Sequence, residues 1–156
     1  MQNLAMLYLH QNLIKEITGL DKLTNLTTLN LSHNRITKLS GLEKCQNLER
    51  IDISHNHILD IDECSALHEL KQLTCLDLRE NHIDTPNTVI AFFEKIPSMN
   101  CLYMSKNPCV RKISGYRKNL TIAMPNLHYL DERPLFEAER LTADAFKRGG
   151  KEEEER

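Results

Sequence analysis

The sequence predicts a solenoid of the α/β class, in which short parallel strands line a concave face and 3₁₀ or helical segments return the chain between them. Two observations lead to this prediction: an asparagine recurs at nearly constant spacing, and the same arrangement of apolar residues precedes each of these asparagines. A third is a helical pattern followed by one last strand pattern near the C-terminus, which is how a solenoid covers its terminal apolar face.

The repeat is defined by its asparagines, which are 22, 22, 25 and 26 residues apart. They are Asn12, Asn34, Asn56, Asn81 and Asn107. The apolar residues before them are Leu4, Leu7 and Leu9; Leu26, Leu29 and Leu31; Leu48, Ile51 and Ile53; Leu73, Leu76 and Leu78; Met99, Leu102 and Met104. A partial sixth copy follows at Leu127 and Leu130. The shared pattern, LxxLxLxxN, is the leucine-rich-repeat signature, and five copies in register exclude chance.

Each copy predicts a strand followed by a turn. The two leucines of the LxL segment point to one face of a short strand, into the coil. The asparagine is too polar to be buried without partners, so its amide is expected to bond backbone groups at the turn between coils. We therefore expect six parallel strands, with the five asparagines buried in one structural ladder.

The return segments differ between early and late coils. In the first three coils, apolar residues recur at close to three-residue spacing, as at Ile14, Ile17 and Leu20, which suits a narrow 3₁₀ segment of the short SDS22-like class. In the fourth coil, Pro86 begins a stretch in which the apolar residues of 89–96 recur at helical spacing. That stretch is predicted to be an α-helix, and it accounts for the longer period.

These patterns divide the chain into three parts. Residues 1–108 hold the five coils, and residues 109–148 form a C-terminal cap with the partial sixth strand and a terminal helix. Residues 149–156 form a charged tail that is expected to be disordered. The first coil begins close to the N-terminus, at Leu4, without a capping segment, so its apolar edge is expected to be exposed and to favour end-to-end self-association.

Composition narrows the function classes. A net charge of −2 lacks the basic excess of a general nucleic-acid binder, and no apolar run is long enough to span a membrane. Five spread cysteines without a CxxC pair fit reduced thiols. No phosphate-binding glycine loop or nucleophile elbow is present. We expect no enzyme, no cofactor, and neither nucleic acid nor membrane as a partner.

Two histidines and a glutamate, all residue types that can bind metals, occupy equivalent positions in successive coils. His33 and His55 occupy the same repeat position and should stack on adjacent coils about 5 Å apart, with Glu80 at the equivalent place in the next coil. Such a set could hold Zn²⁺ or Ni²⁺. Because the spacing of 22 arises from the repeat itself, the sequence predicts no metal site.

A protein-binding surface follows from the repeat frame. Residues next to the inward leucines point outward on the concave face. The candidate binding residues there are Tyr8, Asn30, Arg50, Asp52, Asp77, Arg79, Tyr103 and Tyr129. Tyr and Arg are among the residue types that most often anchor interfaces. The alternative is a solvated sheet surface in which Arg50 and Asp52, and Asp77 and Arg79, neutralise each other.

The C-terminal third carries a more specific pattern. The segments 107–111, 116–117 and 125–134 resemble the cap of SDS22-like proteins. The continuation through 135–136 and 143–150 is similar to that of the leucine-rich-repeat axonemal dynein assembly factors. Here Phe146 and Glu132 stand where that family has Trp and Asp.

This resemblance implies a non-enzymatic scaffold in the cytoplasm of ciliated cells, associated with the cilium or flagellum. Its implied partners are dynein subunits or their assembly chaperones, and its implied role is to help dynein arms assemble before transport. That family has further repeats upstream of the first coil seen here. Another SDS22-like adaptor remains the alternative, of the phosphatase-regulatory, spliceosomal or axonemal dynein light-chain type.

Overall fold

The computed structural model describes residues 3–149, and its strands form one seven-stranded sheet in chain order. The strands are β1 (Met6–Tyr8), β2 (Thr28–Asn30), β3 (Arg50–Asp52), β4 (Cys75–Asp77), β5 (Cys101–Tyr103), β6 (Tyr129–Leu130) and β7 (Arg133–Pro134). β1 to β6 pair in parallel, in the register of the repeat, and the short β7 runs antiparallel to β6. The predicted leucine-rich-repeat solenoid with six parallel strands is therefore confirmed, and β7 is an addition.

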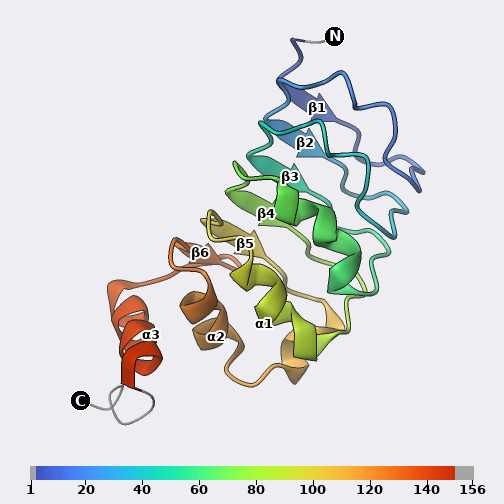
Figure 1. Ribbon diagram of the computed structural model, residues 1–156. Coiled ribbons are helices and arrows are strands. Elements are labelled where there is room, and N and C mark those ends of the chain that lie inside the picture. The colour runs from blue at the N-terminus through green and yellow to red at the C-terminus, as the bar shows by residue number, and fades with distance from the viewer. Residues whose placement is uncertain (1–2, 150–156) are drawn as a thin grey trace.

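The strands line one side of the solenoid and the return segments the other (Figure 1). The return segment of the third coil contains the 3₁₀ helix η1 (Ile61–Glu69), and that of the fourth is the α-helix α1 (Pro86–Glu94). The predicted helix in the fourth coil is confirmed, and Val89, Phe92 and Phe93 lie buried on its inner side. Pro86 starts α1 because it lacks the N–H that a first helical residue cannot use.

The expected 3₁₀ segments are wrong for the first two coils. Their described return segments contain only turns and bends. Isolated turn hydrogen bonds form, such as those from the Leu23 N–H to the Leu20 carbonyl and from the Cys45 N–H to the Leu42 carbonyl. Gly19 and Gly41 adopt left-handed φ values of +79° and +74°, so no continuous right-handed helix can pass through these positions.

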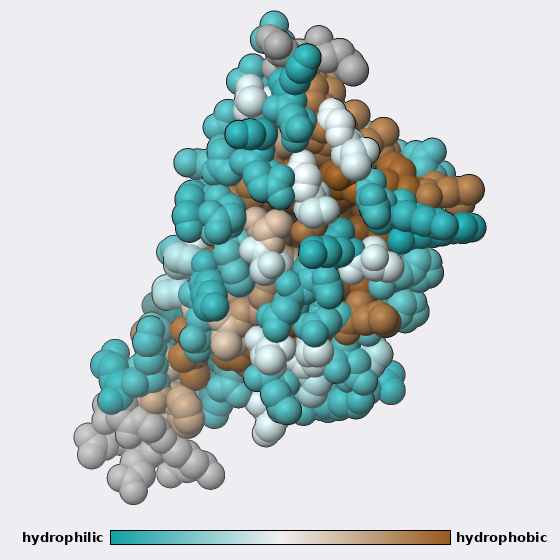
Figure 2. Space-filling view, turned by 45° about the vertical axis from the view of Figure 1, so that its right-hand side comes forward, coloured by the Kyte–Doolittle hydropathy of each residue, from teal (hydrophilic) through white to brown (hydrophobic). Residues whose placement is uncertain are grey.

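The core is one continuous apolar column inside the coils. The central strand residues Leu29, Ile51, Leu76, Leu102 and Leu130 are all at most 2% exposed, so each coil packs only against its neighbours. In the first coil Leu4, Leu7, Leu9 and Ile14 are only partly buried, and hydrophobic surface appears beside the N-terminal end in Figure 2. None of the helices between residues 3 and 149 has the length and apolar character to cross a bilayer.

The cap closes the other end with η2 (Pro108–Lys112), α2 (Tyr116–Ala123) and α3 (Glu137–Gly149). Arg117 joins α2 to α3 through an ion pair of 2.8 Å with Glu139, and donates to the Leu130 carbonyl at 3.1 Å. Arg140 on α3 donates to the Leu127 carbonyl at 2.8 Å. Gly149 ends α3, and the rest of the expected tail, residues 150–156, lies outside the described residues.

Candidate protein-binding face

The asparagine ladder sets the turn that follows each strand. Asn56 is 2% exposed, and its amide nitrogen donates to three carbonyls, including those of Leu31 at 3.0 Å and Ile53 at 3.1 Å. Its Oδ1 accepts the Ile36 N–H at 2.9 Å. Asn34, Asn81 and Asn107 are buried and repeat this arrangement between neighbouring coils. The ladder therefore joins each coil to the one before it.

Asn12 does not belong to the buried ladder, so that part of the prediction is wrong. Its side chain is exposed, and its amide donates only to the carbonyls of Leu9 and His10, within its own coil. The other asparagines each bond a carbonyl of the preceding coil, and Asn12 belongs to the first coil of the described structure. The pattern match at this position therefore does not produce burial.

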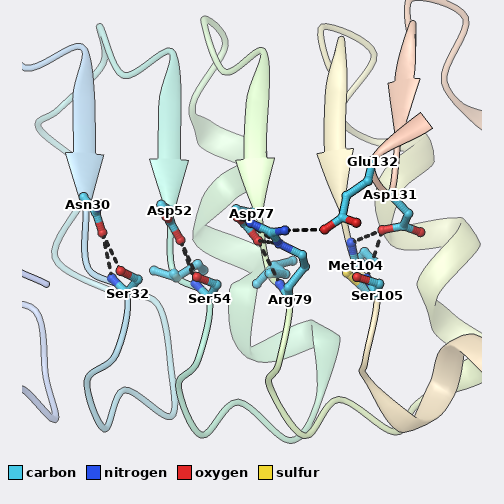
Figure 3. A network of polar contacts seen from close by, with 12 residues as sticks. Asn30, Ser32, Asp52, Ser54, Asp77, Arg79, Met104, Ser105, Asp131 and Glu132 are labelled. Carbon is cyan, nitrogen blue, oxygen red and sulfur yellow. Dashed lines mark hydrogen bonds and ion pairs between the residues drawn. The ribbon is translucent and has the colours of Figure 1, made fainter. Parts of the chain in front are cut away.

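A second ladder of polar side chains lies at the carboxyl ends of the strands (Figure 3). The Asn30 Oδ1 accepts the backbone N–H of Ser32 at 3.0 Å and its hydroxyl at 2.8 Å. Asp52 accepts the same two groups of Ser54 at 3.0 and 2.7 Å. Side chains that bond the backbone two residues ahead hold the chain in a tight turn. Asn30 and Asp52 therefore have a structural role in the turn, which the repeat pattern alone does not predict.

In the fifth coil the cap completes this ladder. Tyr103 occupies the position of Asn30 and Asp52 and has no oxygen suited to the turn. Instead, the Asp131 Oδ1 accepts the N–H groups of Met104 at 2.6 Å and Ser105 at 2.9 Å. The Asp131 Oδ2 in turn accepts the Tyr116 hydroxyl at 2.6 Å. Tyr103 stands where β2 to β4 have Asn or Asp, and this is the sequence signal that the turn needs an acceptor from another segment of the chain.

Asp77 and Arg79 form the tightest charged cluster on the strand face. Asp77 is 8% exposed, and the Arg79 Nη2 lies 2.7 Å from its carboxylate and Nη1 lies 2.7 Å from Glu132. The guanidinium carbon also lies 4.7 Å from the centre of the Tyr103 ring. The hydrogen bond to Asp77 raises the pKa of Arg79 above its ordinary value. Asp77 and Arg79 therefore neutralise each other, as the solvated-surface alternative expects.

Arg50 differs from Arg79. Its side chain is exposed on β3, and within residues 3–149 its guanidinium has no hydrogen bond or ion pair. The Asp52 carboxylate, two residues along the same strand, bonds Ser54 instead. Among the described residues no ion pair joins Arg50 to Asp52, so the alternative of mutual neutralisation does not hold for this pair. Arg50 is left as a cation available to a partner.

Tyrosines flank this cation along the sheet. Tyr8 is 56% exposed on β1, while Tyr103 is half-buried, with its ring centre 5.7 Å from that of Tyr129. Between them lie two hollows of about 180 and 480 Å³, and both are lined by Arg50, Cys75 and Tyr103. The larger hollow also has Thr74, Asn100 and Cys101 in its wall. The predicted binding residues thus lie along one surface, which we call the concave face.

The histidines form stacked pairs along the turns. The ring centres of His33 and His55 are 4.1 Å apart and nearly parallel, which confirms the predicted stacking. His57 and His82 stack in the same way at 5.7 Å. Glu80 pairs with Lys106 at 3.2 Å instead of approaching the histidines. Across the described part of the chain, no three His, Cys, Asp or Glu residues are grouped so that they could hold a metal ion.

The repeat is also recognised by comparison with protein families. The family model described as "Leucine Rich repeats (2 copies)" matches residues 2–44, and the model "Leucine Rich repeat" matches residues 44–61. These matches cover the first coils, where the 22-residue period is most regular.

Curated relatives share a common description. The chain is 42% identical over 94 residues, 60% of its length, to "Leucine-rich repeat-containing protein ODA7" of Chlamydomonas reinhardtii. It is 41% identical over 97 residues to the "Dynein axonemal assembly factor 1 homolog" of Drosophila pseudoobscura pseudoobscura, and 38% over 92 residues to "Dynein axonemal assembly factor 1" of Homo sapiens. The matches span 62% and 58% of this chain. They span only 22%, 6% and 13% of the three relatives.

Solved structures show the same architecture. A chain in the Drosophila melanogaster SNF/U2A′ complex aligns with a TM-score of 0.73 and 24% identity, over 94% of this chain and 84% of that one. An internalin from Listeria monocytogenes aligns with a TM-score of 0.59 and 25% identity, over 83% of this chain and 41% of that one. The first of these likenesses, at its low identity, establishes the fold alone.

Proposed function

We propose that this chain, which folds as a leucine-rich-repeat solenoid and is similar in sequence to dynein axonemal assembly factors, is a non-enzymatic scaffold for the assembly of axonemal dynein arms. In this proposal it acts in the cytoplasm of cells that build cilia or flagella, and its partners are dynein subunits or their assembly chaperones. The names of the relatives support a role in axonemal dynein assembly. The repeat fold supports protein binding as the way in which the chain takes part.

The concave face is the proposed binding surface, centred on Arg50. The single observation that carries this choice is that Arg50 borders both hollows and has no partner within the described residues. A guanidinium without an internal ion pair can bond an acidic side chain of a partner at two points. Tyr8, Tyr103 and Tyr129 offer large, rigid contact surfaces on either side.

Four of the candidate residues take a lesser part in this proposal. Asn30, Asp52, Asp77 and Arg79 are engaged in the turns, so a substitution there would change the fold as well as the surface. They fix the turns next to the strands that carry Arg50 and the tyrosines. Loss of partner binding in variants of these four residues would therefore not separate binding from folding.

The experiment that tests the proposal is affinity capture followed by quantitative mass spectrometry. The immobilised chain is incubated with cytoplasmic extract from cells that are building motile cilia, and beads carrying an unrelated leucine-rich-repeat protein serve as the control. We expect axonemal dynein subunits or their chaperones to be enriched on the beads that carry this protein and not on the control beads. Capture of the same set by both proteins, or of phosphatase or spliceosomal subunits instead, would contradict the assembly role.

We also propose that the first coil pairs with a second copy of the chain. Its apolar residues Leu4, Leu7, Leu9 and Ile14 are only partly buried, and Leu9 and Ile14 line a hollow of about 140 Å³. Within residues 3–149, β1 is hydrogen-bonded to β2 alone, and an edge strand of this kind can pair with another chain. Light scattering should show a mass that rises with concentration, and a constant monomer mass would contradict this proposal.

A further inference from the structure

Two cysteines occupy the same position on neighbouring strands of the concave face. Cys75 on β4 and Cys101 on β5 are partners in the parallel register, so their side chains stand next to one another on the same side of the sheet. Both are partly exposed, whereas Cys45, Cys64 and Cys109 are buried in the core. The pair therefore differs from the other thiols in both placement and access.

The separation of the two strands suits a bond between these sulfurs. Neighbouring strands lie about 4.8 Å apart, within the range of about 4.4–6.8 Å between the Cα atoms of a disulfide. The two sulfurs are also electrostatically close, since burial and then Cys101 raise the pKa of both Cys75 and Tyr103. The hollow of about 480 Å³, lined by both cysteines, admits a small reagent from solvent.

We propose that Cys75 and Cys101 form a redox-active dithiol site in the concave face, which is converted to a cross-strand disulfide by exchange with a low-molecular-weight disulfide. The Cys101 thiolate attacks one sulfur of the reagent, forms a mixed disulfide and releases one small thiol. The Cys75 sulfur, after losing its proton to solvent, attacks the Cys101 sulfur and releases the second small thiol. Two protein thiols are oxidised, and the reagent disulfide is reduced to two thiols, so electrons and hydrogens balance.

The order of attack follows from the surroundings of the two sulfurs. Burial, and then the neighbouring Cys101 sulfur, raise the pKa of Cys75 to about 12, so Cys75 supplies little thiolate and is not the first to attack. Its attack follows when the Cys101 mixed disulfide lies next to it on the neighbouring strand. Arg50 on β3 partly offsets the rise in pKa by favouring the Cys75 thiolate, while Asp77, on β4 with Cys75, opposes it. Cys45, Cys64 and Cys109 are fully buried, so a reagent in solution does not reach them in the folded chain and these core thiols are expected to stay inert.

The disulfide would act on partner binding, and this consequence rests on the proposed function of the concave face. Cys75 and Cys101 lie between Arg50 and Tyr103 in the wall of the same hollow. A bond between the two sulfurs would change the shape of the hollow that a partner would contact. The formation of the bond can be measured on the isolated chain, so its failure and a failure of the assembly role are separate results.

Tryptic peptide mapping tests the proposal directly. The sequence places Cys75 in peptide 72–79 and Cys101 in peptide 96–106, and each of the other cysteines falls in a different peptide. The folded chain is incubated with glutathione disulfide, unreacted thiols are alkylated, and the digest is analysed under non-reducing conditions. We expect one dominant species in which peptides 72–79 and 96–106 are joined, with Cys45, Cys64 and Cys109 still alkylated.

Removing the second thiol tests whether Cys75 resolves the mixed disulfide on Cys101. In Cys75→Ser, Cys101 should retain a glutathione adduct, because no second thiol is present to displace it. Circular dichroism checks that each variant and the oxidised chain remain folded. Retention of both thiols in the wild-type chain, stable adducts in place of the cross-link, or cross-links that involve the core cysteines would each overturn the proposal.

Discussion

Replacing Asn56 by alanine tests the ladder that holds successive coils together. The substitution removes the only side-chain acceptor of the buried Ile36 N–H. An unsatisfied buried donor costs about 1–3 kcal/mol. The carbonyls of Leu31, Ile53 and Ser54 also lose a donor, but each keeps another, from Asn34, Asn81 and the His33 N–H respectively. At about 0.5 kcal/mol for each of the three lost second bonds, the total loss in free energy of unfolding comes to about 2.5–4.5 kcal/mol.

Asn12→Ala is the matched control, since it makes the same chemical change at the same repeat position. Asn12 is exposed and bonds two carbonyls of its own coil, so its loss leaves no buried donor without a partner. We expect it to cost less than about 1 kcal/mol.

The assay is equilibrium unfolding in urea followed by circular dichroism. Asn56→Ala should lower the midpoint without changing the slope, since the surface exposed on unfolding is the same. Equal losses for the two variants, or a loss below about 1 kcal/mol for Asn56→Ala, would refute the argument that the ladder, and not the apolar frame alone, joins the coils.

Three further predictions concern the core, the turns and the cap. Leu130→Ala should lower the free energy of unfolding by about 2–5 kcal/mol, because it opens a cavity under β6, and urea unfolding measures it. Gly19→Ala should cost about 1–2 kcal/mol through its left-handed backbone alone, whereas Gly41→Ala should cost clearly more, because its new Cβ would collide with a backbone carbonyl; equal losses would refute this. The hydrogen bond from Arg117 lowers the pKa of Glu139 below its ordinary 4.5, so this contribution is complete above that pH and is lost as pH falls through the lowered value. Glu139→Gln should remove this acid-dependent part in unfolding experiments between neutral pH and pH 3, and an unchanged pH profile would contradict it.

The repeat frame was predictable because period and burial come from the same residues. Leu29 and Ile51, 22 residues apart, must face the same core once the coil length is known. Where the pattern is local, as in α1, helical spacing and Pro86 were enough to predict the helix. The return segments of the first two coils were not predictable in this way, since three-residue apolar spacing fits both a 3₁₀ helix and a string of separate turns.

The roles of the concave-face residues were less accessible from sequence. The pattern identifies which side chains face outward, but not which of them the turns use. Asp52 and Arg50 are two residues apart and of opposite charge, yet Asp52 bonds Ser54 and leaves Arg50 without a partner among the described residues. The contact between Arg79 and Glu132 joins residues 53 positions apart, and no periodicity encodes it.

The most direct test of the central claim is the dissociation constant of Arg50→Glu for the dynein-assembly partner identified by capture. Arg35→Glu is the matched control, since it makes the same charge reversal at an exposed arginine outside the strands. Both variants should keep the wild-type melting temperature. Arg50→Glu should weaken binding at least tenfold, or about 1.4 kcal/mol, while Arg35→Glu binds as the wild type does. Equal affinities for both variants would contradict the claim that the concave face around Arg50 binds the partner.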